Sequence, residues 1–462
     1  MLARRILAIA MPHLLPYSLL CNASCSCVCW LIFWVCASWQ PLVAADSSTS
    51  STVESCFPGR ASSPQIVTQE PRLVAEDPFG KKFQVDLSNQ DSIPLLHVYG
   101  SPYELGRAHG ALLKFEIQNM YFEFFRYLEN LAINALHLNI LPDMLARCLA
   151  RLMVNFALDL TYLLTWKFTP SRYVDEMVGL ADGANVNYRD VVRIQMFPEL
   201  SKASCSMLGS WGSATFDTSK AGSLYQLRAL DWDMTSPIIG FHTIIFFHPA
   251  DGNQFAIFTW SGFIGCVTGY SGMLGVSEKV WLESGQVYSR VGMPWHFVLR
   301  DVLQFTKNIQ TTKLFLESVK RTCPLFVGIG SSLQNKFVLL SYSLDAVELY
   351  DDSNFTLVTL EKPKHQPPGV VFIDKYVQPS NDPCMEDLVN NSYGVLNGTS
   401  LLKMVSVLRS GDMHIAIYDF SANLVYFSWA VMNQTMKTIQ LAYKRPFLKI
   451  DMGSLLQSNA RT

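Results

Sequence analysis

The chain has 462 residues, of which 49% are hydrophobic and 16% are charged; this composition predicts one large or two modest folded domains and excludes a disordered protein. Lys and Arg together number 36 and Asp and Glu 38, for a formal net charge of −2. The chain therefore lacks the basic excess that nucleic-acid binding by counterion release requires. The 11 cysteines show no paired spacing beyond residue 36 that is typical of a zinc site, and no metal or organic cofactor is predicted.

Residues 1–45 have the composition of an export signal. Arg4 and Arg5 are their only charged residues, and the long apolar stretch that follows ends in small residues at 42–45, before a polar run. This boundary predicts signal-peptide cleavage after residue 45. The alternative is a signal anchor, in which residues 27–45 cross the bilayer and hold the protein at the membrane. In both cases the rest of the chain lies on the non-cytoplasmic side.

Four N-x-[ST] acceptors in the C-terminal part of the chain agree with export: Asn354, Asn390, Asn397 and Asn433. Such sites are glycosylated only on the surface of secreted chains. The sequence therefore predicts a glycoprotein of the secretory pathway, located outside the cell or in a lysosome-like compartment.

The first half of the exported chain has a helical pattern. Residues 46–71 are rich in Ser, Thr, Pro and Gly and predict a linker, and a short strand-like run follows at 95–99. From 103 to 170, apolar residues recur at intervals of three and four, which predicts two or three helices. Shorter helices are predicted at 171–183 and 188–196. We therefore expect residues 72–204 to form a mainly helical segment.

After residue 205 the pattern changes to short apolar runs separated by turns. Strands are predicted at 224–229, 242–248, 254–260, 264–270, 274–280, 337–342, 346–350, 414–420 and 424–429. Helices are predicted at 294–307, 311–321 and 400–408. Sequential hairpins imply antiparallel sheets, so the whole pattern predicts an α+β fold of layered sheets with helices outside.

The segment from 201 to 234 carries the residues that suggest chemistry. Ser204-Cys205-Ser206 stands where helices give way to strands, and a later run reads Arg-Ala-Leu-Asp-Trp at 228–232. This order resembles the N-terminal nucleophile hydrolases of the penicillin acylase, choloylglycine hydrolase and acyl-CoA:6-aminopenicillanic acid acyltransferase group. The run GSPYELGRAHG at 100–110 resembles the marker of the acyltransferase branch, also classed as C45 peptidases.

The resemblance implies a fold and a maturation step. The fold is a four-layer αββα sandwich made by residues 205–462, with 72–204 as a pro-segment that stays attached. The precursor cuts its own backbone between Ser204 and Cys205, and Cys205 then carries both the nucleophilic thiol and a free α-amine. Because an α-amine has an ordinary pKa near 7.7 to 8.0, it can act as the general base.

The resemblance also implies roles for two further residues and a substrate class. Asp231 would bind the α-amine of Cys205, and the charge of Arg228 would lower the thiol pKa. The reaction would be hydrolysis of, or acyl transfer from, a linear amide that is not an ordinary peptide bond. The resemblance extends to lysosomal amidases that act on lipid amides, so the expected partner is a small-molecule or lipid amide.

This chain departs from the family pattern in its oxyanion donors. Ala229 stands where the family usually has Asn, and Tyr270 or Ser271 falls where a second strand usually supplies an Asn amide. A further family Asn has no match near 372–375. The resemblance therefore leaves the donors that would stabilise an oxyanion unassigned.

Two other interpretations of Cys205 remain open at this stage. In a thiol hydrolase without internal cleavage, a histidine would act as the base, and His414 is the candidate. In a secreted or membrane-held binding protein on a decayed hydrolase scaffold, Cys205 would be an unreactive buried thiol.

Overall fold

The structure, a computed structural model, describes residues 56, 64–88, 91–201, 203–215, 222–281, 289–355, 366–378, 380, 382–433 and 438–457. These residues belong to a single structural unit. The predicted export segment, residues 1–45, and most of the predicted linker lie outside the described residues.

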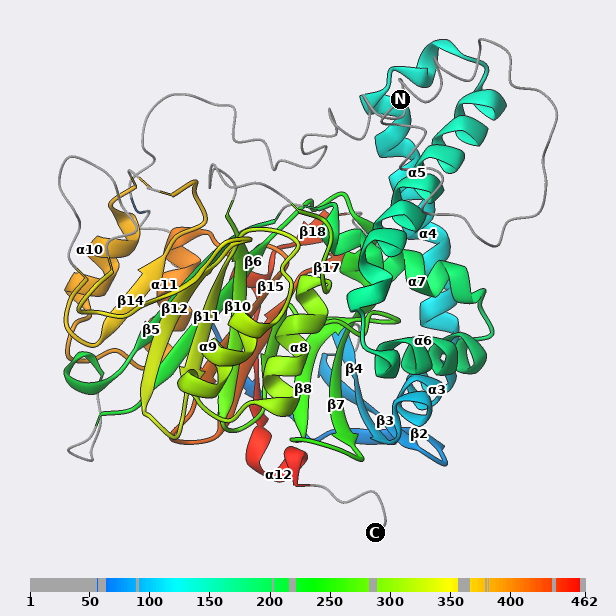
Figure 1. The fold of residues 1–462 in the computed structure, drawn as a ribbon. Helices are drawn as coiled ribbons and strands as arrows, with labels where there is room; N and C mark the ends of the chain where they lie inside the picture. The colour runs from blue at the N-terminus through cyan, green and yellow to red at the C-terminus, as the bar shows by residue number, and fades with distance from the viewer. Residues whose placement is uncertain are drawn as a thin grey trace. The chain divides into compact units, whose positions relative to one another are not determined.

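Two large sheets form the centre of the protein (Figure 1). The smaller sheet has the strand order β1 (Ile66–Thr68), β19 (Phe447–Asp451), β16 (Leu424–Trp429), β15 (His414–Asp419), β6 (Tyr225–Asp231), β5 (Ser204–Ser210) and β14 (Val370–Ile373). The larger has the order β13 (Val347–Tyr350), β12 (Lys336–Tyr342), β11 (Leu325–Ser331), β10 (Leu274–Val280), β9 (Thr268–Tyr270), β8 (Phe255–Trp260), β7 (His242–Pro249), β4 (Asp91–Gly100), β3 (Gly80–Ser88) and β2 (Arg72–Asp77). A short pair, β17 (Val431–Asn433) and β18 (Thr438–Gln440), stands apart.

Neighbouring strands run antiparallel except at two places, where β1 pairs with β19 and β4 pairs with β7 in parallel. The α-helices are α3 (Pro102–Leu112), α4 (Lys114–Ala135), α5 (Asp143–Thr165), α6 (Ser171–Ala184), α7 (Tyr188–Met196), α8 (Trp295–Phe305), α9 (Ile309–Ser318), α10 (Cys384–Asn391), α11 (Gly398–Leu408) and α12 (Met452–Leu456). Short 3₁₀ turns include η2 (Leu138–Ile140) and η4 (Phe197–Glu199).

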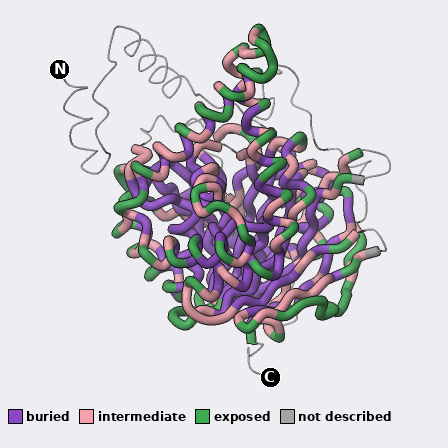
Figure 2. The backbone as a smooth tube through the Cα atoms, turned by 90° about the vertical axis from the view of Figure 1, so that its right-hand side faces the viewer, coloured by how far each residue is buried: buried purple, intermediate pink, exposed green. Residues whose placement is uncertain are grey.

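Three apolar clusters show how these elements are layered. One cluster lies between the two sheets and includes Met207, Phe246 and Tyr418. A second lies between the larger sheet and helices that include α3, α8 and α9, and a third lies between the smaller sheet and helices α10 and α11. The layers are therefore α, β, β and α, and the predicted α+β sandwich is confirmed. Figure 2 shows the buried residues concentrated in the interior of the protein.

The sandwich begins earlier in the sequence than expected. Strands β2, β3 and β4 belong to the ten-stranded sheet, so the segment 72–204 is helical only from Pro102 onward. The expected linker likewise contains β1, which pairs with β19. Strand β2 is exposed along most of its length. Its sequence therefore lacks the alternation of apolar and polar residues by which a half-buried strand is recognised.

One disulfide joins distant parts of the chain. Cys56, in the expected linker, is bonded to Cys384 at the start of α10. Of the remaining cysteines among the described residues, Cys205, Cys266 and Cys323 are buried free thiols and Cys148 is an exposed one. The sequence alone left this pairing open.

Buried histidines predict how stability depends on pH. Burial lowers the pKa from 6.5 to about 3 or about 4 for His97, His109, His242, His248 and His296. Each stays neutral in the fold but is protonated in the unfolded chain below pH 6.5. The stability that these groups contribute is therefore present above pH 6.5 and is lost as the pH falls, by up to about 1.4 kcal/mol per histidine and pH unit.

Buried carboxyl groups act in the opposite direction. Burial raises the pKa of Glu199 to about 7 and, together with the charge of Asp231, the pKa of Asp412 to about 8. Their contribution is lost as the pH rises through those values. Burial likewise raises the pKa of Glu176, Asp231, Glu278, Asp301 and Asp374. The buried carboxyl groups therefore offset part of the stability that the histidines lose as the pH falls.

Candidate active site

The start of strand β5 places Cys205 opposite the strand that carries Arg228 and Asp231. In the β5–β6 ladder, Ser204 pairs with Asp231 and Cys205 pairs with Leu230. The Cys205 side chain is fully buried. The backbone nitrogen of Cys205 therefore lies within one residue of the register position of Asp231. Cys205 lies 23 or more residues before Arg228 and Asp231 in the sequence, and the antiparallel pairing of β5 with β6 brings them together.

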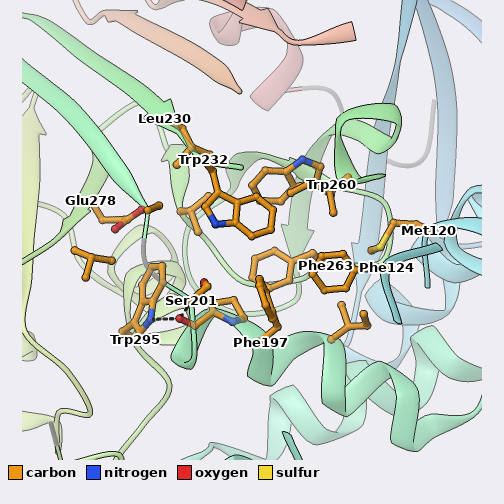
Figure 3. Close-up of a pocket in the computed structure, with 16 residues that line it drawn as sticks. Met120, Phe124, Phe197, Ser201, Leu230, Trp232, Trp260, Phe263, Glu278 and Trp295 are labelled. Atoms are coloured by element: carbon orange, nitrogen blue, oxygen red, sulfur yellow. Dashed lines mark hydrogen bonds between the residues drawn. The ribbon is translucent and has the colours of Figure 1, made fainter. Parts of the chain in front are cut away.

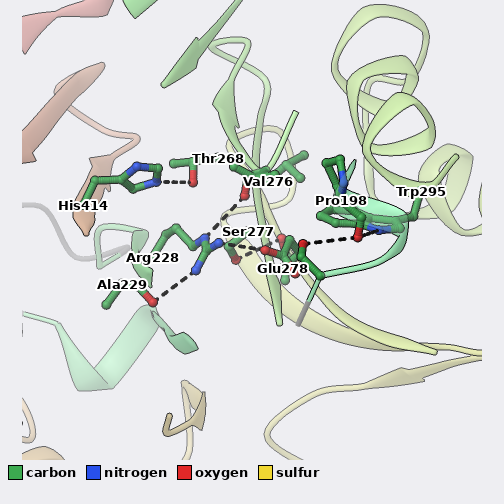
Figure 4. A network of polar contacts seen from close by, with 12 residues as sticks. Pro198, Arg228, Ala229, Thr268, Val276, Ser277, Glu278, Trp295 and His414 are labelled. Carbon is green, nitrogen blue, oxygen red and sulfur yellow. Dashed lines mark hydrogen bonds and ion pairs between the residues drawn. The ribbon is translucent and has the colours of Figure 1, made fainter. Parts of the chain in front are cut away.

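Arg228 links the two sheets through a network of buried polar contacts (Figure 4). Its guanidinium is fully buried and donates from Nε to the Val267 carbonyl at 3.3 Å and from Nη1 to the Ala229 carbonyl at 3.1 Å. The third donor, Nη2, bonds Glu278 Oε1 on β10 of the larger sheet at 2.8 Å. This planar arrangement of three acceptors suits arginine and cannot be reproduced by the single ammonium of lysine.

The environment of Cys205 favours the protonated thiol. Burial raises its pKa from 9.0 to about 12, and this effect exceeds the lowering by the neighbouring Arg228 charge. The carboxylates of Glu278 and Asp231 raise the pKa further. Because a thiolate is the nucleophilic form of cysteine, a catalytic role for Cys205 would require a change that brings water or another positive charge to the thiol.

Asp231 is held in place by the turn between α11 and β15. Its Oδ2 accepts the Ser410 hydroxyl at 2.6 Å, and its Oδ1 accepts the backbone N–H groups of Gly411 at 2.8 Å and Asp412 at 3.2 Å. The Ser410 hydroxyl also lies 2.7 Å from that of Ser206. These bonds fix the Asp231 carboxylate at the end of β6, where Asp231 pairs with Ser204 in the β5–β6 ladder. The role of Ser410 was not found from sequence, because nothing local distinguishes it from an ordinary turn residue.

A buried lysine stands next to Glu278 and was also missed. Lys279 on β10 donates to the backbone carbonyls of Asp374 and Tyr376. Burial lowers its pKa to about 8, while Asp374, Cys205 and Asp231 act to raise it. Asp374 lies in the segment 372–375, which has no match to the further family Asn. In the sequence, Glu278 and Lys279 stand side by side within the predicted strand 274–280. This was the signal that could have revealed both residues, since charged side chains are rarely buried unless they are paired.

The two residues considered for the oxyanion site are committed elsewhere. The Tyr270 hydroxyl donates to Asn423 Oδ1 at 2.8 Å, and its ring belongs to the cluster between the sheets. Ser271 Oγ accepts the Leu274 backbone N–H at 3.1 Å within the β9–β10 turn. Neither side chain is therefore available to bind an oxyanion at Cys205 in this structure.

His414 does not contact Cys205. His414, on β15, pairs with Leu230 on β6, and Leu230 pairs with Cys205 on β5. Two strand spacings, about 10 Å, therefore separate the backbones of His414 and Cys205. Its Nε2 is 2.8 Å from the Thr268 hydroxyl (Figure 4). The geometry therefore disfavours a base at His414 for the thiol of Cys205.

An apolar pocket borders the candidate site (Figure 3). It has about 710 Å³ of atom-free space, including the part that opens to solvent. Its lining comes from α4, α7, η4 and the strands near Cys205: Met120, Phe124, Ile194, Phe197, Pro198, Ser201, Ala203, Leu230, Trp232, Ile238, Trp260, Phe263, Val267, Glu278, Val280 and Trp295. Glu278 alone among these residues is charged. Ser201 and Ala203 lie four and two residues before Cys205, so the pocket touches the segment that leads to the predicted cleavage point.

The predicted glycosylation acceptors differ in exposure. Asn354 and Asn390 are exposed. Asn397 is half-buried and caps α11, because its Oδ1 accepts the Ser400 N–H at 2.9 Å. The side chain of Asn433 lies outside the described part of the chain. Separately, the described residues contain no group of three His, Cys, Asp or Glu side chains that could hold a metal ion.

Comparison with known structures finds limited similarity. The chain resembles a Caenorhabditis elegans ortholog of N-acylethanolamine-hydrolyzing acid amidase, with 16% identity and a TM-score of 0.37 over 47% of this chain and 93% of the other. It also resembles penicillin V acylase from Agrobacterium tumefaciens, with 10% identity and a TM-score of 0.32 over 51% of this chain and 84% of the other. Likenesses this low do not by themselves assign a fold or an activity.

Comparison with known sequences gives a clear relationship. No family model matches the chain. It is 38% identical to protein dcd1B of Dictyostelium discoideum over 411 residues, which cover 84% of this chain and 80% of dcd1B. It is 36% identical to dcd1A of the same organism over 408 residues, which cover 84% of this chain and 91% of dcd1A. The chain therefore belongs to the family of the Dictyostelium dcd1 proteins.

Proposed function

We propose that this protein is an N-terminal nucleophile cysteine amidohydrolase or acyltransferase that matures by cutting itself between Ser204 and Cys205. The observation that carries the proposal is the β5–β6 register. It sets the fixed carboxylate of Asp231 opposite Ser204 and the charge of Arg228 near the Cys205 thiol. This is the arrangement that a nucleophile with its own α-amine as base requires.

Self-cleavage would proceed as an N-to-S acyl shift. The Cys205 sulfur attacks the carbonyl carbon of Ser204, the C–N bond between the two residues breaks, and the nitrogen takes up the thiol proton to become the α-amine of Cys205. Water then hydrolyses the thioester and leaves a carboxylate on Ser204 and a free thiol on Cys205. The carboxylate of Asp231, which pairs with Ser204 across the ladder, would bind the α-ammonium group as it forms.

Cleavage would also open the pocket towards the thiol. Ser201 and Ala203 form part of the pocket wall and belong to the new chain end, which is no longer tied to Cys205. Water that enters the site and the new α-ammonium charge would both stabilise the thiolate. They would therefore lower the thiol pKa, which burial holds high in the precursor.

In turnover, the α-amine would take the thiol proton while the Cys205 sulfur attacks the substrate amide carbonyl. The amine product leaves with that proton, and water or an acceptor amine then releases the acyl group from the thioester. The pocket lining, with Trp232, Trp260 and Trp295 among its residues, favours an apolar acyl group of a small-molecule or lipid amide. Apolar groups gain most from such a site, because their transfer from water drives binding.

The Glu278 carboxylate in the pocket supports the alternative, a binding protein on a decayed hydrolase scaffold. Glu278 Oε2 has no hydrogen-bond partner, and the oxyanion donors of the family are missing. A pure binding protein would keep the pocket and leave Cys205 inert. This alternative predicts an intact chain and no covalent labelling of Cys205 by thiol reagents.

The test is the N-terminal sequence of the purified protein. We expect a second N-terminus that reads Cys205-Ser206-Met207. On a gel, two fragments should separate only after reduction, because the Cys56–Cys384 disulfide joins the two sides of the cleavage point. An intact chain that is active would favour a histidine-based thiol hydrolase, and an intact, inactive chain would favour the binding protein.

We further propose that the protein is exported and glycosylated, and is found outside the cell or in a lysosome-like compartment. Asn354 and Asn390 are exposed, as glycan acceptors must be. Glycosidase treatment should lower the mass of the C-terminal fragment and leave the N-terminal one unchanged. Absence of any mass shift in a glycosylating host would remove this support for export.

A further inference from the structure

Helices α4 and α5 expose many large apolar side chains to solvent. The exposed residues on the pair and just beyond it are Phe115, Phe122, Ile140, Met144, Leu145, Leu152, Phe156, Leu163 and Trp166. The two most exposed, Ile140 at 86% and Met144 at 82%, lie where the chain turns from α4 through η2 into α5. This turn stands clear of the two sheets (Figures 1 and 2). We call it the tip.

The exposed residues of α5 form one stripe. Leu145, Leu152, Phe156 and Leu163 follow one another at intervals of seven, four and seven, which places them on the same helix face. The opposite face carries buried small residues such as Ala146, Ala150 and Ala157, and the helix packs on α4 and α7. Within the described residues, Asp143–Phe168 is the one helix long and apolar enough to cross a membrane by length and composition, and it is 33% buried.

Arginines flank this apolar surface. Arg126, Arg147 and Arg151 line a groove between α4, α5 and α7. Arg147 pairs with Asp143 at 3.0 Å and Arg151 with Glu129 at 2.6 Å, while Arg126 lies over the ring of Phe122. All three remain exposed to solvent. Since a guanidinium has five N–H donors, each can contact a phosphate without giving up its present contact.

The same helix reaches the pocket beside Cys205. Met120 and Phe124 of α4 line that pocket, while Phe122 and Arg126 lie on the groove side of the helix. An apolar ligand that leaves a lipid layer at the α4–α5 pair would therefore meet the pocket along the first half of the same helix, α4. This continuity favours a lipid surface over a second protein as the occupant.

We propose that the α4–α5 pair docks the protein on a bilayer that contains anionic phospholipid. The tip residues Ile140 and Met144 enter the acyl region, and Arg126 and Arg147 contact lipid phosphates. A projecting apolar surface with basic residues beside it is the combination by which helices bind at a bilayer interface. The docking is independent of the proposed chemistry, so Cys205→Ala should bind vesicles as the wild type does.

The test is flotation of the secreted protein with vesicles of phosphatidylcholine alone or with a third of phosphatidylglycerol. The double variant Ile140→Gln, Met144→Gln should bind both kinds of vesicle about ten-fold more weakly. Arg126→Gln, Arg147→Gln should lose the preference for anionic vesicles and its sensitivity to salt. All variants keep the same N-terminus, checked by sequencing, so residues 1–45 contribute equally throughout.

The matched control is Leu314→Gln, Leu333→Gln, which removes two apolar residues that are 63% and 65% exposed elsewhere on the protein. It should bind as the wild type does, and all variants should keep the wild-type Tm. Equal binding by the tip variant and the wild type would overturn the proposal, as would equal weakening in the control. A wild-type dimer that the tip variant converts to a monomer, with vesicle binding unchanged, would assign the surface to a second copy instead.

Discussion

Cys205→Ala is expected to leave the chain uncut and without amide-hydrolysing activity. The thiol performs both the acyl shift that breaks the Ser204–Cys205 bond and the later attack on substrate, and alanine can do neither. The expected readouts are a single N-terminus and no turnover on a panel of acyl amides. Because Cys205 is fully buried and alanine is smaller, the fold should survive with a modest loss of stability.

Cys205→Ser separates the two steps. A hydroxyl can perform the same acyl shift, so some self-cleavage should remain, but turnover should fall strongly because the hydroxyl is the poorer nucleophile near neutral pH. Cys266→Ala is the matched control, since Cys266 is also a fully buried free thiol whose pKa burial raises to about 12. It should cleave and turn over normally. Normal cleavage in Cys205→Ala would refute the proposed function whatever the control does.

Much of the fold follows from local pattern. Helix α7 and strand β10 begin and end at the residues predicted, because turn residues precede both: Asn187 comes before α7, and Gly272 comes shortly before β10. Strand β11 was missed because Gly328 and Gly330 break its apolar run. A Cβ at these positions would come within 2.5 Å of Ser277 Oγ and 2.4 Å of Gln226 Oε1, respectively. These glycines allow close approach of neighbouring side chains, a constraint that no local pattern shows.

The candidate site was predictable only as far as its motifs extend. Cys205, Arg228 and Asp231 lie on two strands joined by one hairpin, so a short segment carries them. Glu278 is 50 residues from Arg228 and Ser410 is 179 from Asp231, and they meet only because the two sheets and the α11–β15 turn converge. Their contribution depends on pairing and burial, which the sequence does not display.

Arg228→Lys should reduce turnover by about a hundred-fold, the scale of a lost electrostatic contribution. Lysine keeps a positive charge but cannot serve the Val267 and Ala229 carbonyls and Glu278 together. The variant should also lose about 3 kcal/mol of stability, because a buried carboxylate is left poorly paired. Activity must therefore be expressed per folded molecule, with the folded fraction measured by circular dichroism.

Arg300→Lys is the control for that loss of stability. Arg300 is equally buried and forms two bonds to Glu176, at 2.8 and 2.7 Å, away from Cys205. It should lose similar stability but keep turnover per folded molecule. If both lysine variants lose turnover alike, the loss in Arg228→Lys reflects the fold and not the chemistry.

Asp231→Asn tests the α-amine with little disturbance of the fold. The asparagine Oδ1 can still accept the Gly411 N–H, and its amide can donate to the Ser410 hydroxyl, which can act as donor or acceptor. What disappears is the charge that would bind and orient the α-ammonium of Cys205. Turnover should again fall by about a hundred-fold, while Tm stays close to that of the wild type. Full activity in both Asp231→Asn and Arg228→Lys would remove these residues from the site, and with them the proposed mechanism.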